Sequence, residues 1–565
     1  MEEKFDAIVI GTGISGGWAA KELCENGLKT LVLERGRMVK HVVDYPTMHD
    51  ENWDFTHRNR ITPAEEARQE KQSRTGYTTA EASKHWFVDD IDHPYSETKR
   101  FDWMRGYHVG GRSITWGRHS YRLSEMDFEA NKKDGHGVDW PIRYNDIAPW
   151  YDKVEEYIGV CGTNLGLKQL PDGKLTEAMP FNCVEADFAD RVAENMDGRV
   201  VTQGRVAHIT GDKSHEGRSK CQFRNRCIRG CPFGGYFSSL ASTLPAAQKT
   251  GKMTLRPNSI AHEIVYDATS EKATGVKVID SETKEELFFE AEIIFCCASA
   301  IASTSILMQS TSERFPNGLG NDSGELGHNI MDHQLGVGAY AVVNEHEDKY
   351  YKGRKPGGFY IPRFRNLEGE PAHDRFKRGY GYQGAASRQN WRRAVSELSY
   401  GKDFKDDLVK PGPWVIGMGG FGECLPYHEN KISLNYDELD QWGLPTVDFD
   451  VEFKENEELM REDIKEQAIA MLKAAGYENV RGFDDRSQYA PGLAIHEMGG
   501  ARMGRDPKTS ILNKHNQIHN VKNVYVTDGA CMTSAGCQNP SLTYMAITAR
   551  AANHAAQEFK KTRNI

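Results

Sequence analysis

Apolar residues gather in two short runs near the start of the chain, on either side of a glycine-rich turn. Residues 5–10 (FDAIVI) form a short, mostly apolar run that predicts a buried parallel strand. A helix is predicted over 18–26, ended by Gly27, and a second apolar strand over 30–33. The pattern therefore predicts a strand–turn–helix–strand unit.

Downstream, the pattern predicts a mixture of strands and helices without an internal repeat. Strands are predicted over 253–280, 290–297, 431–434 and 446–453, and helices over 144–158, 455–475 and 542–560. Residues 40–100 are polar and aromatic without periodicity, so we expect a long excursion there.

The first turn carries the spacing G-x-G-x-x-G. Gly11 permits the tight turn, Gly13 lets the backbone approach a pyrophosphate, and Gly16 lets the helix pack closely on the strand. The helix N-terminus offers N–H donors to that pyrophosphate. Glu34 ends the second strand, where a carboxylate accepts from a ribose hydroxyl. We predict a dinucleotide site here, and a ligand-free glycine-rich hairpin is the alternative. Further predicted contacts are Ile14, Ser15 and Arg35.

Composition and charge exclude several classes of protein. The 565 residues are 38 % hydrophobic and 27 % charged, which is typical of a globular protein of several domains. The net charge is −10 and no block of Lys and Arg is present, so we expect no nucleic-acid partner. No apolar run is long enough for a transmembrane helix, and the chain shows no export signal of its own.

Three of the eleven cysteines stand close together. Cys221, Cys227 and Cys231 lie within 11 residues, in a basic stretch, and this spacing predicts a metal site. A structural zinc site usually has four protein ligands and no open coordination position, whereas a three-iron, four-sulfur cluster takes three cysteines. We therefore predict a [3Fe-4S] cluster, with zinc and unligated thiols as alternatives. The isolated positions of the other cysteines indicate folding in a reducing compartment.

Four segments together resemble the glucose–methanol–choline oxidoreductase family, and the resemblance covers essentially the whole chain. They are 11–17 with 33–36 (LERG), 105–117 (RGYHVGGRSITWG), 327–333 (GHNIMDH) and 524–552, which contains the QNP at 538–540. The resemblance implies bound FAD. The further cofactor-binding residues that it implies are Gly110, Gly111, Ser113, Thr115, Trp116, Gly117, Asp528, Asn539 and Pro540.

The family resemblance also implies an architecture that mixes α/β and α+β parts. A Rossmann-like FAD-binding domain is built from discontinuous segments, beside a substrate domain with an antiparallel sheet. We expect the FAD domain in 1–50, 100–125, 200–340 and 490–565, with the cysteine loop near 218–236. We expect the substrate domain and insertions in 51–99, 126–199 and 341–489.

Alcohol oxidation needs a base for the hydroxyl proton and a donor for the developing alkoxide. His496 and Asn539 match the family's catalytic pair, as base and orienting donor. Without the motif, His496 would be a core histidine and Asn539 a helix cap before Pro540. We interpret His333 as flavin-domain architecture rather than as part of the chemistry. Thr115 stands where some family members tether FAD through histidine, so we expect non-covalent FAD, with His108 a weaker candidate tether.

The chain is most similar to catalytic subunits of bacterial sugar dehydrogenases acting on gluconate, fructose, glucose and glycosides. This resemblance implies oxidation of a sugar or glycoside to a keto sugar, with carbon 3 of a glucoside as the favoured position. Electrons would pass through the cluster to a cytochrome-type acceptor. A small signal-bearing subunit would take the chain, folded in the cytoplasm, to the periplasm; a cytoplasmic enzyme is the alternative. Competing functions are an oxygen-using oxidase with structural cysteines and a catalytically silent flavin-binding subunit.

Overall fold

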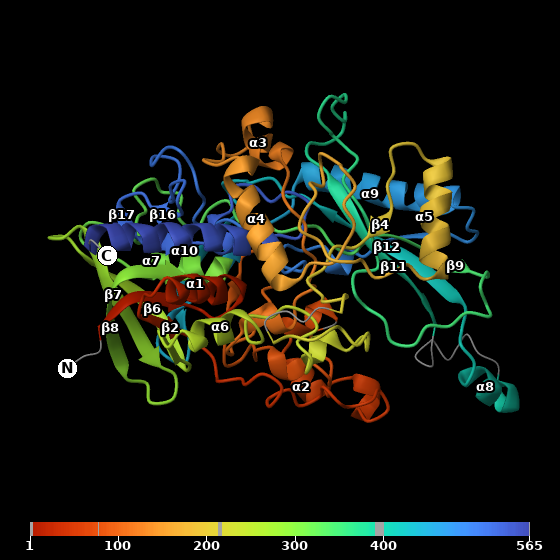
Figure 1. Ribbon diagram of the computed structural model, residues 1–565, viewed down its shortest axis with the longest axis horizontal. Coiled ribbons are helices and arrows are strands. Elements are labelled where there is room, and N and C mark those ends of the chain that lie inside the picture. Colours follow the sequence, from red (N-terminus) through yellow and green to blue (C-terminus); the bar gives the residue numbers. More distant parts are fainter. Residues whose placement is uncertain (1–3, 77, 213–216, 390–399, 564–565) are drawn as a thin grey trace.

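The larger sheet joins the beginning of the chain to its end (Figure 1). The computed structural model describes residues 4–76, 78–212, 217–389 and 400–563. Five strands run parallel in the order β17–β8–β1–β2–β5. They are β1 (Phe5–Ile10), β2 (Thr30–Leu33), β5 (Met253–Arg256), β8 (Glu286–Cys296) and β17 (Val521–Val526). Parallel strands are covered on both faces, which explains why β1 and β2 are mostly apolar.

Antiparallel strands extend this sheet at two places. The first half of β8 pairs with β7 (Lys272–Asp280), which pairs with β6 (Ser259–Asp267). On the other side, β16 (Gln517–Ile518) pairs with β17. The predicted strand region 253–280 therefore forms three strands.

Helices cover the parallel strands. α1 (Ile14–Glu25) lies on β1, β2 and β8 and packs against α10 (Ser541–Arg563) and α6 (Thr243–Lys249). α4 (Tyr144–Ile158) packs on α10, although its segment was expected in the substrate domain. Its buried face, which includes Ile147, Tyr151 and Val154, joins the core of the larger sheet, so packing places this helix with the cofactor-side elements.

The second sheet is antiparallel, as expected for the substrate side. Its order is β15–β9–β12–β11–β10–β4, and α5 (Cys183–Asn195) and α9 (Glu455–Ala474) pack on it. The strands are β4 (Thr202–Gln203), β9 (Val337–Val343), β10 (Phe359–Ile361), β11 (Tyr380–Arg388), β12 (Trp414–Gly422) and β15 (Arg481–Asp484). Segment 200–340 was expected in the FAD domain, yet it supplies β4 and the start of β9, because these strands find their hydrogen-bond partners in β10 and β12.

A small third sheet ties the early excursion to the later chain. β13 (Lys431–Leu439) pairs with β14 (Pro445–Asp450), and β14 pairs with β3 (Ser96–Glu97). The rings of Phe101 and Phe449 stack beside it, with centroids 4.3 Å apart. The remaining helices are α2 (Pro63–Arg68), α3 (Glu125–Asp134), α7 (Ala300–Gln309) and α8 (Gly401–Leu408). Within the described residues, no helix combines the length and apolar character that crossing a membrane requires.

Candidate active site

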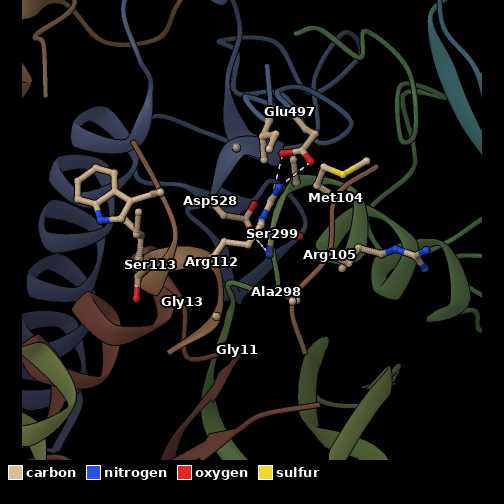
Figure 2. A pocket seen from close by; sticks show the side chains of 18 of the residues that line it. Gly11, Gly13, Met104, Arg105, Arg112, Ser113, Ala298, Ser299, Glu497 and Asp528 are labelled. Carbon is tan, nitrogen blue, oxygen red and sulfur yellow. Dashed lines mark hydrogen bonds and ion pairs between the residues drawn. The ribbon is translucent and has the colours of Figure 1, made fainter. Parts of the chain in front are cut away.

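A cavity of about 680 Å³ lies where the turn after β1, the segment 105–117 and the C-terminal segment meet strands of the antiparallel sheet (Figure 2). Its size is typical of a cofactor site. The predicted site residues that line it are Gly11, Gly13, Ile14, Ser15, Glu34, Arg35, Gly111, Ser113, Thr115, Trp116, Gly117, His496, Asp528 and Asn539. Gly16, Gly110 and Pro540 do not line it. The fold thus brings four distant stretches of sequence to one space.

The three motif glycines are needed for different reasons. Gly11 has φ +99°, and a Cβ there would lie 2.5 Å from the backbone oxygen of Cys297. At Gly16 a Cβ would lie 1.9 Å from the oxygen of Gly11. A Cβ on Gly13, by contrast, would have no protein atom within 4 Å. The protein itself requires Gly11 and Gly16, whereas the space above Gly13, which lines the cavity, is free of protein atoms.

The end of β2 forms one margin of the cavity. The Glu34 carboxylate accepts hydrogen bonds from the backbone N–H of Gly36 (3.0 Å) and of Thr12 (3.2 Å), and burial raises its pKa. Beside it, the Arg35 guanidinium lies over the ring of Tyr107 and pairs with Asp440 at 3.1 Å. These groups are suited to holding the nucleoside end of a dinucleotide.

Asp528 organises the opposite wall. Its carboxylate accepts from the backbone N–H of Ser299 (2.9 Å), the Ser303 hydroxyl (2.5 Å) and the backbone N–H of Ala530 (3.0 Å). Burial raises the pKa of Asp528 to about 6. Ser299 has φ +88°, a conformation that is uncommon for serine, and the hydrogen bond that its backbone N–H donates to Asp528 helps to hold it.

His496 and Asn539, predicted as a pair, meet in the cavity. The Nδ2 of Asn539 lies 3.1 Å from the Nε2 of His496. From β11, Gln383 donates its Nε2 hydrogen to the Oδ1 of Asn539 at 2.5 Å, and the Phe421 ring of β12 lies 6.1 Å from the His496 ring. Burial lowers the pKa of His496 well below its usual value, with smaller contributions from His333, His119 and Arg112. The imidazole is therefore neutral at pH 7.

Sequence reasoning missed two residues that hold the loop of His496. The ring of His333, interpreted as architecture, lies with its Nδ1 2.9 Å from the Nδ1 of His496. The neighbouring Asp332 carboxylate accepts from the backbone N–H of His496 at 3.0 Å. Their position within the MDH segment was the available indication, but nothing in a linear pattern shows which loop they reach.

A bidentate ion pair crosses the cavity. The Arg112 guanidinium contacts both carboxylate oxygens of Glu497 at 2.8 and 3.0 Å (Figure 2). Arg112 belongs to the second glycine-rich segment, and Glu497 follows His496. The pair therefore connects a predicted cofactor-contacting segment to the loop that carries the predicted base, His496.

The three cysteines lie on one irregular loop beside the cavity. Cys221 is buried, Cys231 is half-buried, and Cys227 lines the cavity wall. In the described part of the chain, no three ligand atoms that include these sulfurs lie within 4.8 Å of one another. A tetrahedral zinc site would require sulfurs about 3.8 Å apart. The arrangement therefore does not fit a single zinc ion.

Arginines fasten the cysteine loop to an earlier segment. Arg224, Arg226 and Arg229 each donate to one backbone carbonyl of residues 48–50, at 2.6 to 3.2 Å. The basic stretch is thus largely structural, rather than a solvated charge run.

Buried histidines predict a stability that falls in acid. Burial lowers the pKa of His108 and His333 to about 4, and lowers that of His208 well below its usual value. Below pH 6.5 the unfolded chain binds protons that the folded chain does not, so the free energy of unfolding decreases as pH falls toward 4. We expect a loss on the order of 1 kcal/mol per pH unit for each such histidine.

Thermal unfolding between pH 4.5 and 7.5 tests this expectation. His208→Leu should flatten the pH dependence, and the matched change at an exposed position, His57→Leu, should not. A melting temperature that stays constant or rises in acid would contradict it.

Comparison with known proteins places the geometry in context. Family profiles described as GMC oxidoreductase match residues 5–335 and 426–548. The chain is 25 % identical to a fructose dehydrogenase large subunit of Gluconobacter japonicus, covering 98 % of each chain. It is 26 % identical to a 2-methyl-1,2-propanediol dehydrogenase of Mycolicibacterium austroafricanum, covering 99 % of this chain and 96 % of the relative. A solved formate oxidase variant from Aspergillus oryzae RIB40 shares the fold, with a TM-score of 0.62, 13 % identity and 99 % coverage of both chains.

Proposed function

Because the chain belongs to the GMC oxidoreductase family of FAD-dependent enzymes acting on CH–OH groups, we propose that it is the catalytic subunit of a sugar or glycoside dehydrogenase. The observation that carries this proposal is the 3.1 Å contact between His496 and Asn539 inside the cavity. A base and an amide donor that meet at one point can act on the same hydroxyl group.

The protein residues supply the proton-transfer half of the reaction. The substrate hydroxyl donates to the Nε2 of His496, which takes the proton, and the hydroxyl oxygen accepts from the Nδ2 of Asn539 as negative charge develops. When bound in the cavity, FAD would supply the acceptor for the hydride that leaves the carbinol carbon. Because burial favours the neutral imidazole, His496 is ready to accept a proton at pH 7.

The cavity fits FAD held without a covalent bond. The open space above Gly13 accommodates a pyrophosphate, while Asp528 and the segment 111–117 line the walls. Thr115 lines the cavity at the position of the family's tether, and a threonine hydroxyl is a poor substitute for histidine there. His108 does not line the cavity. Yellow cofactor that stays on the denatured polypeptide would contradict this assignment.

We assign a secondary hydroxyl of a sugar as the substrate group, with carbon 3 of a glucoside as the first position to test. A fructose dehydrogenase large subunit among the relatives supports a sugar. Gln383 and Phe421 bring the antiparallel sheet to the catalytic pair, so this sheet would select the substrate.

We propose that the cysteine loop holds an iron–sulfur cluster, and two hydrogen bonds support this. Backbone N–H groups of Phe223 and Gly235 donate to the sulfurs of Cys221 and Cys231, both at 3.4 Å, as is usual around cluster sulfurs. The thiolates and the cluster together would be anionic. When bound, the cluster would carry single electrons from the reduced cofactor to an outside acceptor.

A buried arginine supports an anion in this loop. The Arg218 side chain is 1 % exposed, its Nη2 has no hydrogen-bond partner, and no ion pair includes it among the described residues. Burial lowers its pKa to about 10, and Tyr157 and then Cys231 act in the opposite direction. A buried cation without a counterion is costly, and an anionic cluster would compensate it.

Cys227→Ser should remove iron from the protein. We expect the wild type, purified without oxygen, to carry stoichiometric iron and the EPR signal of a three-iron cluster, and the variant to lose both because a ligand is missing. Cys183→Ser, which alters a half-buried thiol outside the loop, serves as the control. Absence of iron from anaerobically prepared wild type would refute the cluster.

The decisive test of function is anaerobic mixing with glucosides and other sugars, followed in air by peroxide measurement. Bleaching of the flavin with turnover only in the presence of an artificial electron acceptor supports the dehydrogenase. Stoichiometric peroxide would instead identify an oxidase, and no bleaching by any sugar or alcohol would identify a silent subunit. A cytochrome-type acceptor, and a small signal-bearing subunit for export, are the partners that this proposal entails.

A further inference from the structure

A continuous chain of hydrogen bonds passes through His496. It begins at Gln383, whose Nε2 donates to the Oδ1 of Asn539 (2.5 Å), and continues from the Nδ2 of Asn539 to the Nε2 of His496 (3.1 Å). The Nδ1 of His496 faces the Nδ1 of His333 at 2.9 Å. The chain ends where the Nε2 of His333 meets the backbone oxygen of Gly536 at 2.7 Å.

The hydrogen bond between His333 and Gly536 determines which partner donates in each of the other hydrogen bonds. A carbonyl oxygen can only accept, so the Nε2 of His333 must carry the hydrogen. His333 is buried, pairs with no carboxylate among the described residues, and burial lowers its pKa to about 4, so its ring is neutral and its Nδ1 accepts. The Nδ1 of His496 must therefore donate, which leaves its Nε2 without a hydrogen.

The other end of the chain agrees with this direction. Because Gln383 donates to the oxygen of Asn539, the NH₂ group of Asn539 faces the bare Nε2 of His496. A substrate hydroxyl placed between them would donate to His496 and accept from Asn539, the two roles that the reaction needs.

We infer that His333 is a positioning residue that holds His496 in the tautomer whose Nε2 is free to accept the substrate proton. The inference rests on the proposed function, in which His496 is the base. Among the described residues, no other group makes a hydrogen bond to the Nδ1 of His496, so the tautomer depends on this contact.

Asp332, which precedes His333 in the sequence, holds the backbone of the loop that carries His496. Its carboxylate accepts from the backbone N–H groups of Gly492 (2.7 Å), Ala494 (3.2 Å) and His496 (3.0 Å). The loop needs this hold because Ile495 has φ +59°, an outlier for a β-branched residue. Consecutive residues thus fix the backbone and the ring of His496.

The neutral state of His333 affects how strongly His496 binds a proton. A carboxylate behind the base would stabilise the imidazolium, as aspartate does in the serine-protease triad. The neutral ring of His333 orients His496 without adding negative charge. His496 is thereby oriented while its affinity for the proton stays low.

Two variants of His333 separate its two hydrogen bonds. His333→Gln places a donor near the oxygen of Gly536 but no acceptor at the position of Nδ1, whereas His333→Asn places an acceptor there. With both proteins retaining FAD, we expect the rate of anaerobic flavin reduction to fall about 100-fold in the Gln variant with little change in KM. We expect the Asn variant to reduce its flavin about tenfold faster than the Gln variant, and so about tenfold more slowly than the wild type. His328→Gln, in the same segment, is the control.

The tautomer can be observed without substrate by ¹⁵N NMR of histidine-labelled protein, with His496→Gln identifying the resonances. We expect a protonated Nδ1 and a bare Nε2 at His496 in the wild type, and a tautomer mixture in His333→Gln. A hydrogen on Nε2 in the wild type, or an unchanged tautomer and rate in His333→Gln, would overturn the inference. The expected tautomers in a protein whose flavin no sugar reduces would support the positioning role and defeat only the proposed function.

Discussion

Replacing His496 by alanine is expected to slow sugar-dependent reduction of the bound flavin about 10³-fold, the usual contribution of a general base. The ring meets Asn539 in the cavity, and no second histidine makes a hydrogen bond to Asn539 among the described residues. The protein should still purify with FAD, because the glycine turn and Asp528 remain intact. Anaerobic stopped-flow absorbance of the flavin measures this effect.

The same experiment includes its own checks. His519→Ala changes a histidine that does not line the cavity and should reduce flavin at the wild-type rate. Added imidazole should partly restore the alanine variant, because it can occupy the vacated space as a base. A near-normal rate in His496→Ala without imidazole would show that another group removes the proton.

Substituting Gly13 by valine should yield a folded protein that contains almost no FAD. The first added atom would meet no protein atom within 4 Å, so we expect the fold to tolerate the change. The added side chain would instead occupy the space through which the pyrophosphate passes, and we expect affinity for FAD to fall at least about 100-fold, a cost of roughly 2.7 kcal/mol. Flavin content after purification and titration of the apoprotein with FAD measure this loss.

Two glycine controls make the result specific. Gly211 also has open space around it, so Gly211→Val should keep both fold and FAD. Gly16→Val should damage the fold itself, because its Cβ would lie 1.9 Å from the oxygen of Gly11. Normal FAD loading in Gly13→Val would place the pyrophosphate elsewhere.

Local patterns predicted the parallel core well, and their errors have physical reasons. β1 and β2 are buried on both faces, so nearly every position is apolar (Asp6 and Thr30 are the exceptions) and the strands are recognisable. α1 begins at Ile14, whereas the sequence predicted a start at Trp18. The prediction was late because Gly16 and Gly17, which lie in the first turn, have low helix propensity. β8 begins at Glu286 rather than 290, since its first half alternates between exposed and half-buried positions while it pairs with β7.

The residues of the candidate site that belong to sequence motifs could be predicted. Those that reach the site only through tertiary contacts could not. The motif around His496 and Asn539 identified the pair, which the structure brings together from 43 residues apart. The partner of His496, His333, lies 163 residues away, and Gln383 lies on the other sheet. No local pattern records contacts at this range, because they arise only when the two sheets meet.

The packing of α1 against α10 has a consequence for synthesis of the protein. β1 and α1 are synthesised well before β17 and α10, which complete the parallel sheet and cover α1. Asp528 and Asn539 lie in that same later segment. The nascent chain therefore carries an incomplete parallel sheet until residues 521–563 have been made, and we expect tight capture of FAD only after that segment has emerged.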